Sequence, residues 1–160
     1  MSQATLSIIS NQDNKAEALN RAVWALSAVP NVQVTAVSRV YEADLNEYKG
    51  QEKFLCAAIR IETELSPLSL LYACHGIEAA MGRTRAKKQP QAIDIDILEF
   101  EGFESNTKEL TIPHKDLLNR AHILCPLLSL RPDREFKDAL VKLGETNVKV
   151  TGDGLYLPLK

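Results

Sequence analysis

Two aspartates, Asp94 and Asp96, alternate with isoleucines in the run from Ile93 to Leu98. A strand here would place both carboxylates on one face, with the two aspartate Cα atoms about 6.6 Å apart. Like charges at this spacing are costly on a half-buried surface unless a cation lies between them. Oxygen-ligated divalent cations, and above all Mg²⁺ on nucleotide phosphates, are the usual solution. The alternative is an exposed strand face that happens to carry two acids.

A basic segment lies just upstream, between Gly82 and Pro90. Its four cations, with no acid among them, are Arg83, Arg85, Lys87 and Lys88. Guanidinium groups suit phosphate oxygens, although the end of a helix also favours cations for its dipole alone. Cations for phosphate and carboxylates for Mg²⁺ are the two halves of a phosphoryl-transfer site. The order of the two segments therefore predicts phosphoryl transfer.

A second polar cluster follows, from Ile112 to Arg120. His114 and Arg120 could hold a polyphosphate from a second side, and His122 is close enough in sequence to line the same pocket. A lone histidine is more often a surface or turn residue than a catalyst, and this remains the alternative for His114. Neither GxxxxGK[ST] nor GxGxxG occurs, so phosphate binding would depend on side chains and a metal.

The composition predicts one cytoplasmic domain. The 160 residues, taken as a single domain over 1–160, are enough for a proper core, and the net charge of −2 argues against a general nucleic-acid-binding surface. Cys56, Cys74 and Cys125 stand singly, as reduced thiols do. No signal peptide is visible, and no apolar run approaches the roughly 20 residues of a membrane span. We expect a monomer without membrane or nucleic-acid partners.

Hydrophobic periodicity and turn residues predict the elements that must position these groups. They are strands at 5–10, 32–41 and 54–61, helices at 14–29 and 66–82, a strand at 93–98, a strand-turn-strand at 100–112, a helix at 134–143, a loop at 44–52 and a loosely held tail at 145–160. The helix start rests on Ser66 as N-cap followed by Pro67. The order predicts an α+β fold, a ferredoxin-like α/β sandwich with helices on one face of an antiparallel sheet and the other face free for a site.

Several dispersed blocks together resemble 6-hydroxymethyl-7,8-dihydropterin pyrophosphokinase. They are Gly82-Arg83-x-Arg85, Pro90-x-x-Ile93-Asp94-Ile95-Asp96-Ile97-Leu98, and Ile112-Pro113-His114 through Asn119-Arg120. The resemblance extends over about residues 6–133. It implies the same sandwich fold and an ATP-dependent transfer of pyrophosphate to the hydroxymethyl group of a reduced pterin, giving AMP, in folate biosynthesis.

The resemblance also implies roles for individual residues. Asp94 and Asp96 would bind two Mg²⁺ ions together with ATP. Arg83, His114 and Arg120 would contact ATP phosphates, and Arg85 would belong to a mobile catalytic loop. The pterin would be bound by Phe54, Cys56 and His122. Phe54 would stack on the pterin ring.

The chain departs from the family pattern at four positions and has a shorter basic loop. Ile9 replaces a glycine, Cys56 an asparagine, His122 an aromatic residue and Gln91 an arginine. Lys87 or Lys88 could stand in for that arginine. Two alternatives stay open: a degenerate member that binds Mg-nucleotide or a protein partner, and a pyrophosphokinase for a different heteroaromatic alcohol. An RNA-binding module would need strand aromatics and a basic surface, and only Phe54 qualifies.

Overall fold

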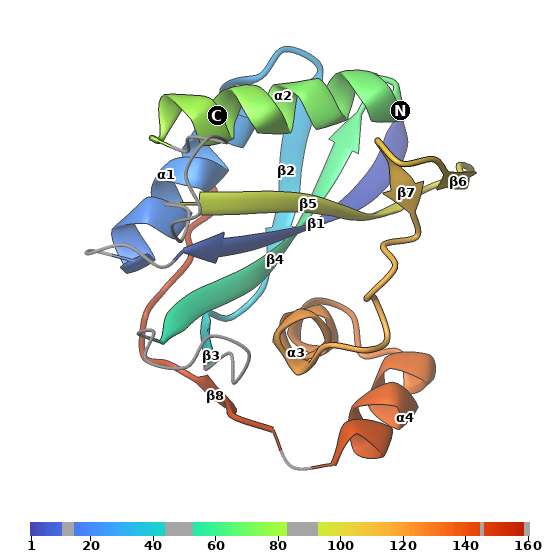
Figure 1. Ribbon diagram of the computed structural model, residues 1–160. Helices are drawn as coiled ribbons and strands as arrows, with labels where there is room; N and C mark the ends of the chain where they lie inside the picture. The colour runs from blue at the N-terminus through green and yellow to red at the C-terminus, as the bar shows by residue number, and fades with distance from the viewer. Residues whose placement is uncertain (11–14, 44–52, 83–92, 145, 159–160) are drawn as a thin grey trace.

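The computed structural model describes residues 1–10, 15–43, 53–82, 93–144 and 146–158, and it has helices on both sides of a central sheet (Figure 1). The elements in chain order are β1 (Ser2–Ser10), α1 (Lys15–Ala28), β2 (Val32–Val37), β3 (Tyr41–Ala43), β4 (Phe54–Thr63), α2 (Pro67–Ala80), β5 (Ile93–Phe100), β6 (Ser105–Asn106), β7 (Thr111–Ile112), α3 (Ala121–Leu130), α4 (Arg134–Leu143) and β8 (Val148–Val150).

The central sheet is antiparallel and runs in the order β5-β1-β4-β3-β8, with β2 also pairing with β4. The long strand β4 pairs with β3 near Phe54 and with β2 near Thr63. The four strands β5, β1, β4 and β2 therefore follow the order of a ferredoxin-like sheet, which confirms the predicted α+β class.

Helices α1 and α2 cover one face, as predicted. Isoleucines and leucines at alternate positions of β1, β4 and β5 point toward these helices and form the main core. Helix α2 begins as the sequence predicted, because the Ser66 hydroxyl accepts a hydrogen bond from the Ser69 N–H at 3.1 Å and Pro67 occupies the first turn.

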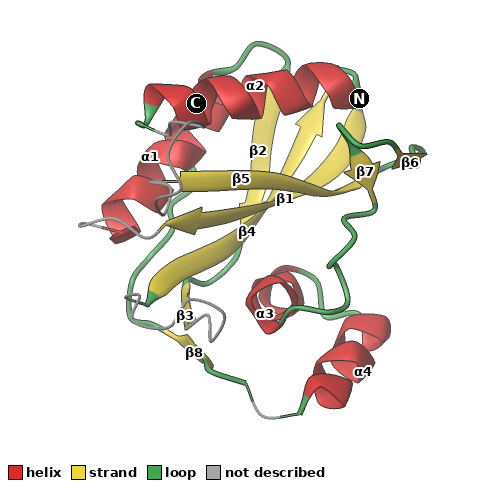
Figure 2. Ribbon diagram, in the orientation of Figure 1, coloured by secondary structure: helices red, strands yellow, loops and turns green. Residues whose placement is uncertain are grey.

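The other face is not free, so that part of the prediction is wrong. Helices α3 and α4 cover part of it and bury a second cluster, Ala58, Leu98, Leu117, Ile123, Leu124, Leu127 and Phe136 (Figure 2). The sequence did not indicate α3 because Pro126 lies inside it. Proline removes one backbone donor and usually interrupts a helix, but here the buried apolar face of α3 outweighs that loss.

A β-bulge in β5 changes the direction of its last residues. Leu6 pairs with Ile97 but Thr5 pairs with Glu99, which leaves Leu98 as the extra residue. Leu98 packs in the α3 cluster, and Glu99 also reaches this side. There the Arg131 guanidinium donates to both Glu99 carboxylate oxygens, at 2.8 and 3.1 Å. The bulge thus joins β5 to the end of α3.

The C-terminal segment, expected to be loosely held, is anchored along residues 146–158. Strand β8 pairs with β3, and the Thr151 N–H donates to the Val40 carbonyl at 3.0 Å. Leu155 packs in the main core. The Asn20 side chain donates to the Gly154 carbonyl at 2.9 Å and accepts from the Tyr156 N–H at 3.0 Å. These contacts join residues that are far apart in the sequence, so no local sequence pattern predicts them.

The expected loop at 44–52 lies outside the described residues. Within the part of the chain that the structure describes, no helix combines the length and apolar character needed to cross a membrane.

Candidate functional site

The two aspartates lie on the same face of β5, as the alternating pattern predicted. In the sheet register, Asp94 is opposite Ile9 and Asp96 is opposite Ser7 on β1. Asp94 is half-buried and Asp96 is exposed, while the isoleucines between and around them are buried in the main core. The strand therefore presents both carboxylates on the side of the sheet that carries α3.

The register places Asp94 in one row with Cys56, one of the residues expected to bind the pterin. The row continues from Asp94 through Ile9 on β1 and Cys56 on β4 to Tyr41 on β3. At about 4.8 Å between neighbouring strands, the Cα atoms of Asp94 and Cys56 are about 10 Å apart. Asp94 and Cys56 are thus two strands apart on one face of the sheet.

Phe54 and His122 meet beside Cys56. Phe54 is buried at the start of β4, and His122 lies in the first turn of α3. Their ring centroids are 5.4 Å apart with the planes at 86°, an edge-to-face contact. The fold therefore brings together two of the three residues that the resemblance assigned to the pterin.

Cys56 is fully buried beside them. Its thiol donates a weak hydrogen bond to the Tyr41 carbonyl, with the sulfur 3.6 Å from the oxygen. Burial raises the pKa of the Cys56 thiol, and the nearby Cys125 adds to the effect. Cys56 is therefore a neutral thiol whose proton is directed at the main chain of β3.

His114 is fixed beside β5 by its backbone. Its N–H donates to the Leu98 carbonyl at 2.9 Å, two residues beyond Asp96 on the same strand. Its ring Nδ1 accepts from the Asp116 N–H at 3.1 Å. In the neutral ring the proton is therefore on Nε2, which makes that atom a hydrogen-bond donor.

Arg120 stands directly before α3 and is half-exposed. Its Nε lies 3.9 Å from a carboxylate oxygen of Asp116, one turn earlier. The same short segment thus orients both His114 and Arg120: Asp116 bonds His114 with its main chain and pairs with Arg120 through its side chain. A main-chain role of this kind gives no signal in the sequence.

Arg83 and Arg85 lie outside the described residues, together with Lys87, Lys88 and Gln91. Their predicted roles stay predictions. On α2, the buried Glu78 accepts a hydrogen bond at 2.9 Å from the N–H of Ile95, the residue between the two aspartates. The sequence alone does not reveal this bond, because it joins residues of two different elements.

The donor set fits a cation that arrives with phosphate. Across the described ranges, no group of three or more histidine, cysteine, aspartate or glutamate side chains converges on one point. Asp94 and Asp96 alone would leave most of a coordination shell open. Mg²⁺ is commonly held in this way, by one or two carboxylates together with substrate phosphates and water.

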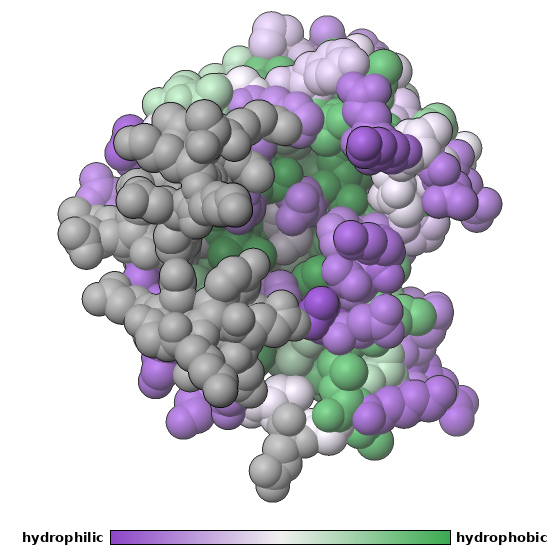
Figure 3. All heavy atoms as spheres, in the orientation of Figure 1, coloured by the Kyte–Doolittle hydropathy of each residue, from purple (hydrophilic) through white to green (hydrophobic). Residues whose placement is uncertain are grey.

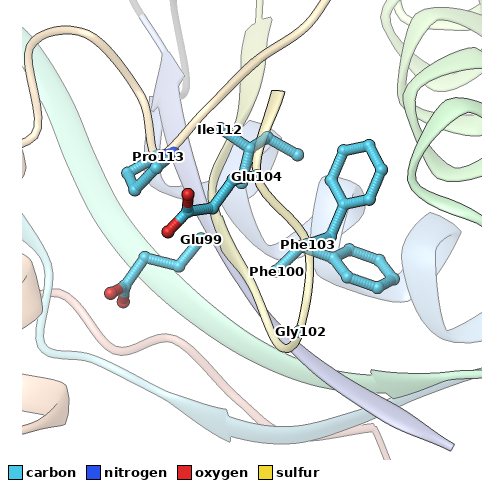
Figure 4. A pocket seen from close by; sticks show the side chains of 7 residues that line it. All are labelled: Glu99, Phe100, Gly102, Phe103, Glu104, Ile112 and Pro113. Carbon is cyan, nitrogen blue, oxygen red and sulfur yellow. The ribbon is translucent and has the colours of Figure 1, made fainter. Parts of the chain in front are cut away.

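Figure 3 shows a hollow at the centre of the front face, where hydrophilic and hydrophobic side chains meet. A separate cavity of about 480 Å³ lies at the far end of β5, lined by Glu99, Phe100, Gly102, Phe103, Glu104, Ile112 and Pro113 (Figure 4). It contains none of the predicted site residues, and its Glu99 is already paired with Arg131. We do not assign it to the site.

Comparison with known proteins shows the family. The family model of 7,8-dihydro-6-hydroxymethylpterin-pyrophosphokinase (HPPK) matches residues 5–132. The 2-amino-4-hydroxy-6-hydroxymethyldihydropteridine pyrophosphokinase of Methylorubrum extorquens is 38% identical over 155 residues, which cover 93% of this chain and 98% of that protein. The protein of the same description from Bacillus subtilis is 33% identical, covering 92% of this chain and 89% of its own length.

A solved structure shows the same fold. Plasmodium falciparum HPPK-DHPS, wild type with pteroate, superposes with a TM-score of 0.69 over 88% of this chain at 16% sequence identity. This chain spans 42% of that longer protein. With the family model and two relatives above 30% identity over most of the chain, this chain belongs to the 7,8-dihydro-6-hydroxymethylpterin-pyrophosphokinase family.

Proposed function

We propose that this chain transfers the β,γ-pyrophosphoryl group of ATP to the hydroxymethyl group of 6-hydroxymethyl-7,8-dihydropterin in folate biosynthesis, releasing AMP. The observation that carries the proposal is the row from Asp94 to Cys56. It places Asp94, for metal and phosphate, on the same face of the sheet as Cys56, beside which Phe54 and His122 offer rings for a flat acceptor. The family of the chain supports this assignment.

Asp94 and Asp96 would hold Mg²⁺ bound to the triphosphate, and we propose two ions. When bound, the metal neutralises charge on the phosphate oxygens, which is the main electrostatic need of phosphoryl transfer. The two carboxylates hold their positions because Ile93, Ile95 and Ile97 are anchored in the core on the opposite face. Their contribution is orientation and charge rather than covalent chemistry.

His114 and Arg120 would bind phosphate oxygens from the α3 side. The Nε2–H of His114 is available as a donor because Nδ1 is held by the Asp116 N–H. Arg120 adds a positive charge at the start of the same helix. Arg83 and Arg85 are proposed to add charge from the basic segment. These groups would align the triphosphate for in-line attack.

In the transfer, the acceptor hydroxyl oxygen forms a bond to the β-phosphorus and loses its proton. The bond from the β-phosphorus to the oxygen that bridges to the α-phosphorus breaks, and AMP leaves with that oxygen. Phe54 and His122 would hold the acceptor ring, with Cys56 below it. The Cα atoms of Asp94 and Cys56 are about 10 Å apart along the row, a separation that a pterin and its hydroxymethyl arm can span.

AMP release tests the proposal. We expect the purified protein with Mg²⁺ and ATP to release AMP in the presence of 6-hydroxymethyl-7,8-dihydropterin and not in its absence. Asp94→Asn and Asp96→Asn should each lower kcat by at least about 100-fold, because each removes charge that the transition state needs. Asp138→Asn, at an exposed acid of α4, is the matched control and should leave kcat unchanged.

No AMP above the control without pterin would contradict the proposed reaction. AMP release that is equal in the wild type and both aspartate variants would instead contradict the proposed metal site. A monomeric state and a cytoplasmic location stay predictions from the sequence; size-exclusion chromatography with light scattering tests the first.

A further inference from the structure

Strand β5 is an edge strand of the sheet, and helix α2 packs against it. It pairs with β1 on one side and with no other strand of the described residues on the other. Along such an edge, alternate N–H groups point away from the sheet and need partners outside it. The Ile95 N–H is one of these, since it donates to Glu78 Oε2 at 2.9 Å (β5 and α2 in Figure 1).

Glu78 is unusual for a carboxylate. Its exposed fraction is 2%, and it is the only charged side chain among the fully buried described residues. Burying a carboxylate is costly unless strong hydrogen bonds compensate. An apolar residue in the same place would pack with Leu71, Cys74 and Ile77 of α2 without that cost. The core therefore gives no packing reason for an acid at this position.

The bonded amide belongs to the peptide unit between Asp94 and Ile95. Holding this N–H fixes the plane of that peptide, which sets the backbone angles that aim the Asp94 side chain at the opposite face. Asp96 follows one residue later on the same face as Asp94. One hydrogen bond from α2 thus acts on the backbone at the midpoint of the carboxylate pair.

We propose that Glu78 is a positioning residue for the metal site: its buried carboxylate holds the Ile95 amide and thereby sets the spacing and direction of Asp94 and Asp96. The proposal rests on the proposed function, in which these two aspartates bind the cation. The feature that matters is a hydrogen-bond acceptor at the position of Oε2, and the negative charge is secondary. Partners that orient metal ligands commonly change metal affinity by about 10- to 100-fold when removed.

Three substitutions at Glu78 separate acceptor from charge. Glu78→Gln keeps an oxygen acceptor at the same reach and removes the charge. Glu78→Asp keeps the charge but withdraws the acceptor by one methylene. Glu78→Met keeps the approximate volume and removes both. Thr63→Val is the matched control, because Thr63 is equally buried and accepts from the Leu65 N–H at 3.0 Å, at the end of β4 far from the aspartates.

The readout is metal-dependent nucleotide affinity, which needs no turnover. Calorimetry gives the Kd of α,β-methylene-ATP with saturating Mn²⁺ and with EDTA, and the ratio of the two is the gain due to metal. We expect Glu78→Met and Glu78→Asp to lower this gain by about 10- to 100-fold. We expect Glu78→Gln to stay within about threefold of the wild type, and Thr63→Val to match the wild type. Amide exchange of Ile95, followed by NMR, should accelerate in the Asp and Met variants only.

Loss in Glu78→Gln with retention in Glu78→Asp would overturn the proposal in favour of the charge itself. An unchanged metal gain in Glu78→Met would overturn it in favour of a purely structural role, and so would an equal loss in Thr63→Val. If Glu78→Met does not fold, the contrast between the Gln and Asp variants decides alone. Asp94→Asn distinguishes failure of the metal site from failure of the positioning role. If Asp94→Asn keeps the full metal-dependent gain in affinity, the proposed metal site fails. If Asp94→Asn loses that gain and the Glu78 variants keep it, only the positioning role of Glu78 is refuted.

Discussion

The imidazole of His122 meets the ring of Phe54 edge to face, with centroids 5.4 Å apart and planes at 86°. A flat ligand stacked between two rings needs about 3.5 Å on each side, so the flanking rings must stand about 7 Å apart and parallel. In the proposed site the acceptor ring would lie between Phe54 and His122, whose rings are now in contact with each other. The proposed mode of acceptor binding therefore requires at least one of the rings to turn, and we expect it to be His122, which is half-exposed whereas Phe54 is buried.

His122 should contribute to acceptor affinity as a flat ring rather than as a base. We expect His122→Phe to keep the KM for the pterin within about threefold and His122→Ala to raise it about 10-fold, because an aromatic contact is worth about 0.5–1.5 kcal/mol beyond its buried area. Steady-state AMP release at varied pterin and saturating ATP measures both. A KM in His122→Ala equal to the wild-type value would show that the second ring is not used.

The tautomer of His114 can be tested with amides that mimic one ring nitrogen each. Glutamine places its NH₂ group near the position of Nε2, and asparagine places its own near Nδ1. Nδ1 is held by the Asp116 N–H, so Nε2 is the donor. We therefore expect the KM for ATP of His114→Gln to be about 10-fold lower than that of His114→Asn. Kinetics at varied ATP decide the order of the two. The reverse order would place the working donor at Nδ1.

The buried thiol of Cys74 should make the free energy of unfolding decrease at alkaline pH. Burial first, and then the negative charges of Glu78 and Asp96, raise the pKa of the Cys74 thiol from 9.0 to about 12. Because the folded-state pKa is the higher one, the unfolded chain releases the proton first, and stability is lost as pH rises above about 9. We expect Cys74 to lower the free energy of unfolding by about 1 kcal/mol per pH unit near pH 10.

Urea denaturation at pH 8.0 and at intervals up to pH 10.5 measures this slope. In Cys74→Ala the slope should be smaller by about the same amount, because the packing defect left by the smaller side chain does not depend on pH. Identical slopes in the two proteins would refute the raised pKa.

The contact between Asn20 and the C-terminal segment should be a stability element. Asn20→Ala removes one donor and one acceptor that hold Gly154 and Tyr156, and we expect it to lower the free energy of unfolding by about 1–2 kcal/mol. Asn106→Ala, at an exposed asparagine of β6, is the control and should stay within about 0.5 kcal/mol. Equal stability of both variants would mean that Leu155 and β8 hold the segment without Asn20.

The sequence by itself determined the local elements and the paired carboxylates. Alternation in the run from Ile93 placed Asp94 and Asp96 on one face of a strand, and Ser66-Pro67 marked the start of α2, because helix caps and strand periodicity depend on near neighbours along the chain. The order of these elements was enough for the fold class and, with the dispersed blocks, for the family.

Only the tertiary structure decided which residues share the site. The alignment of Asp94 with Cys56 depends on the pairing of β1 with two other strands, and the direction of Glu99 depends on the bulge at Leu98. The contact of His122 with Phe54 requires α3 to pack on the second face of the sheet, despite Pro126 within it. Register, bulges and helix docking are set by contacts between distant segments, and no window of sequence contains both partners of such a contact.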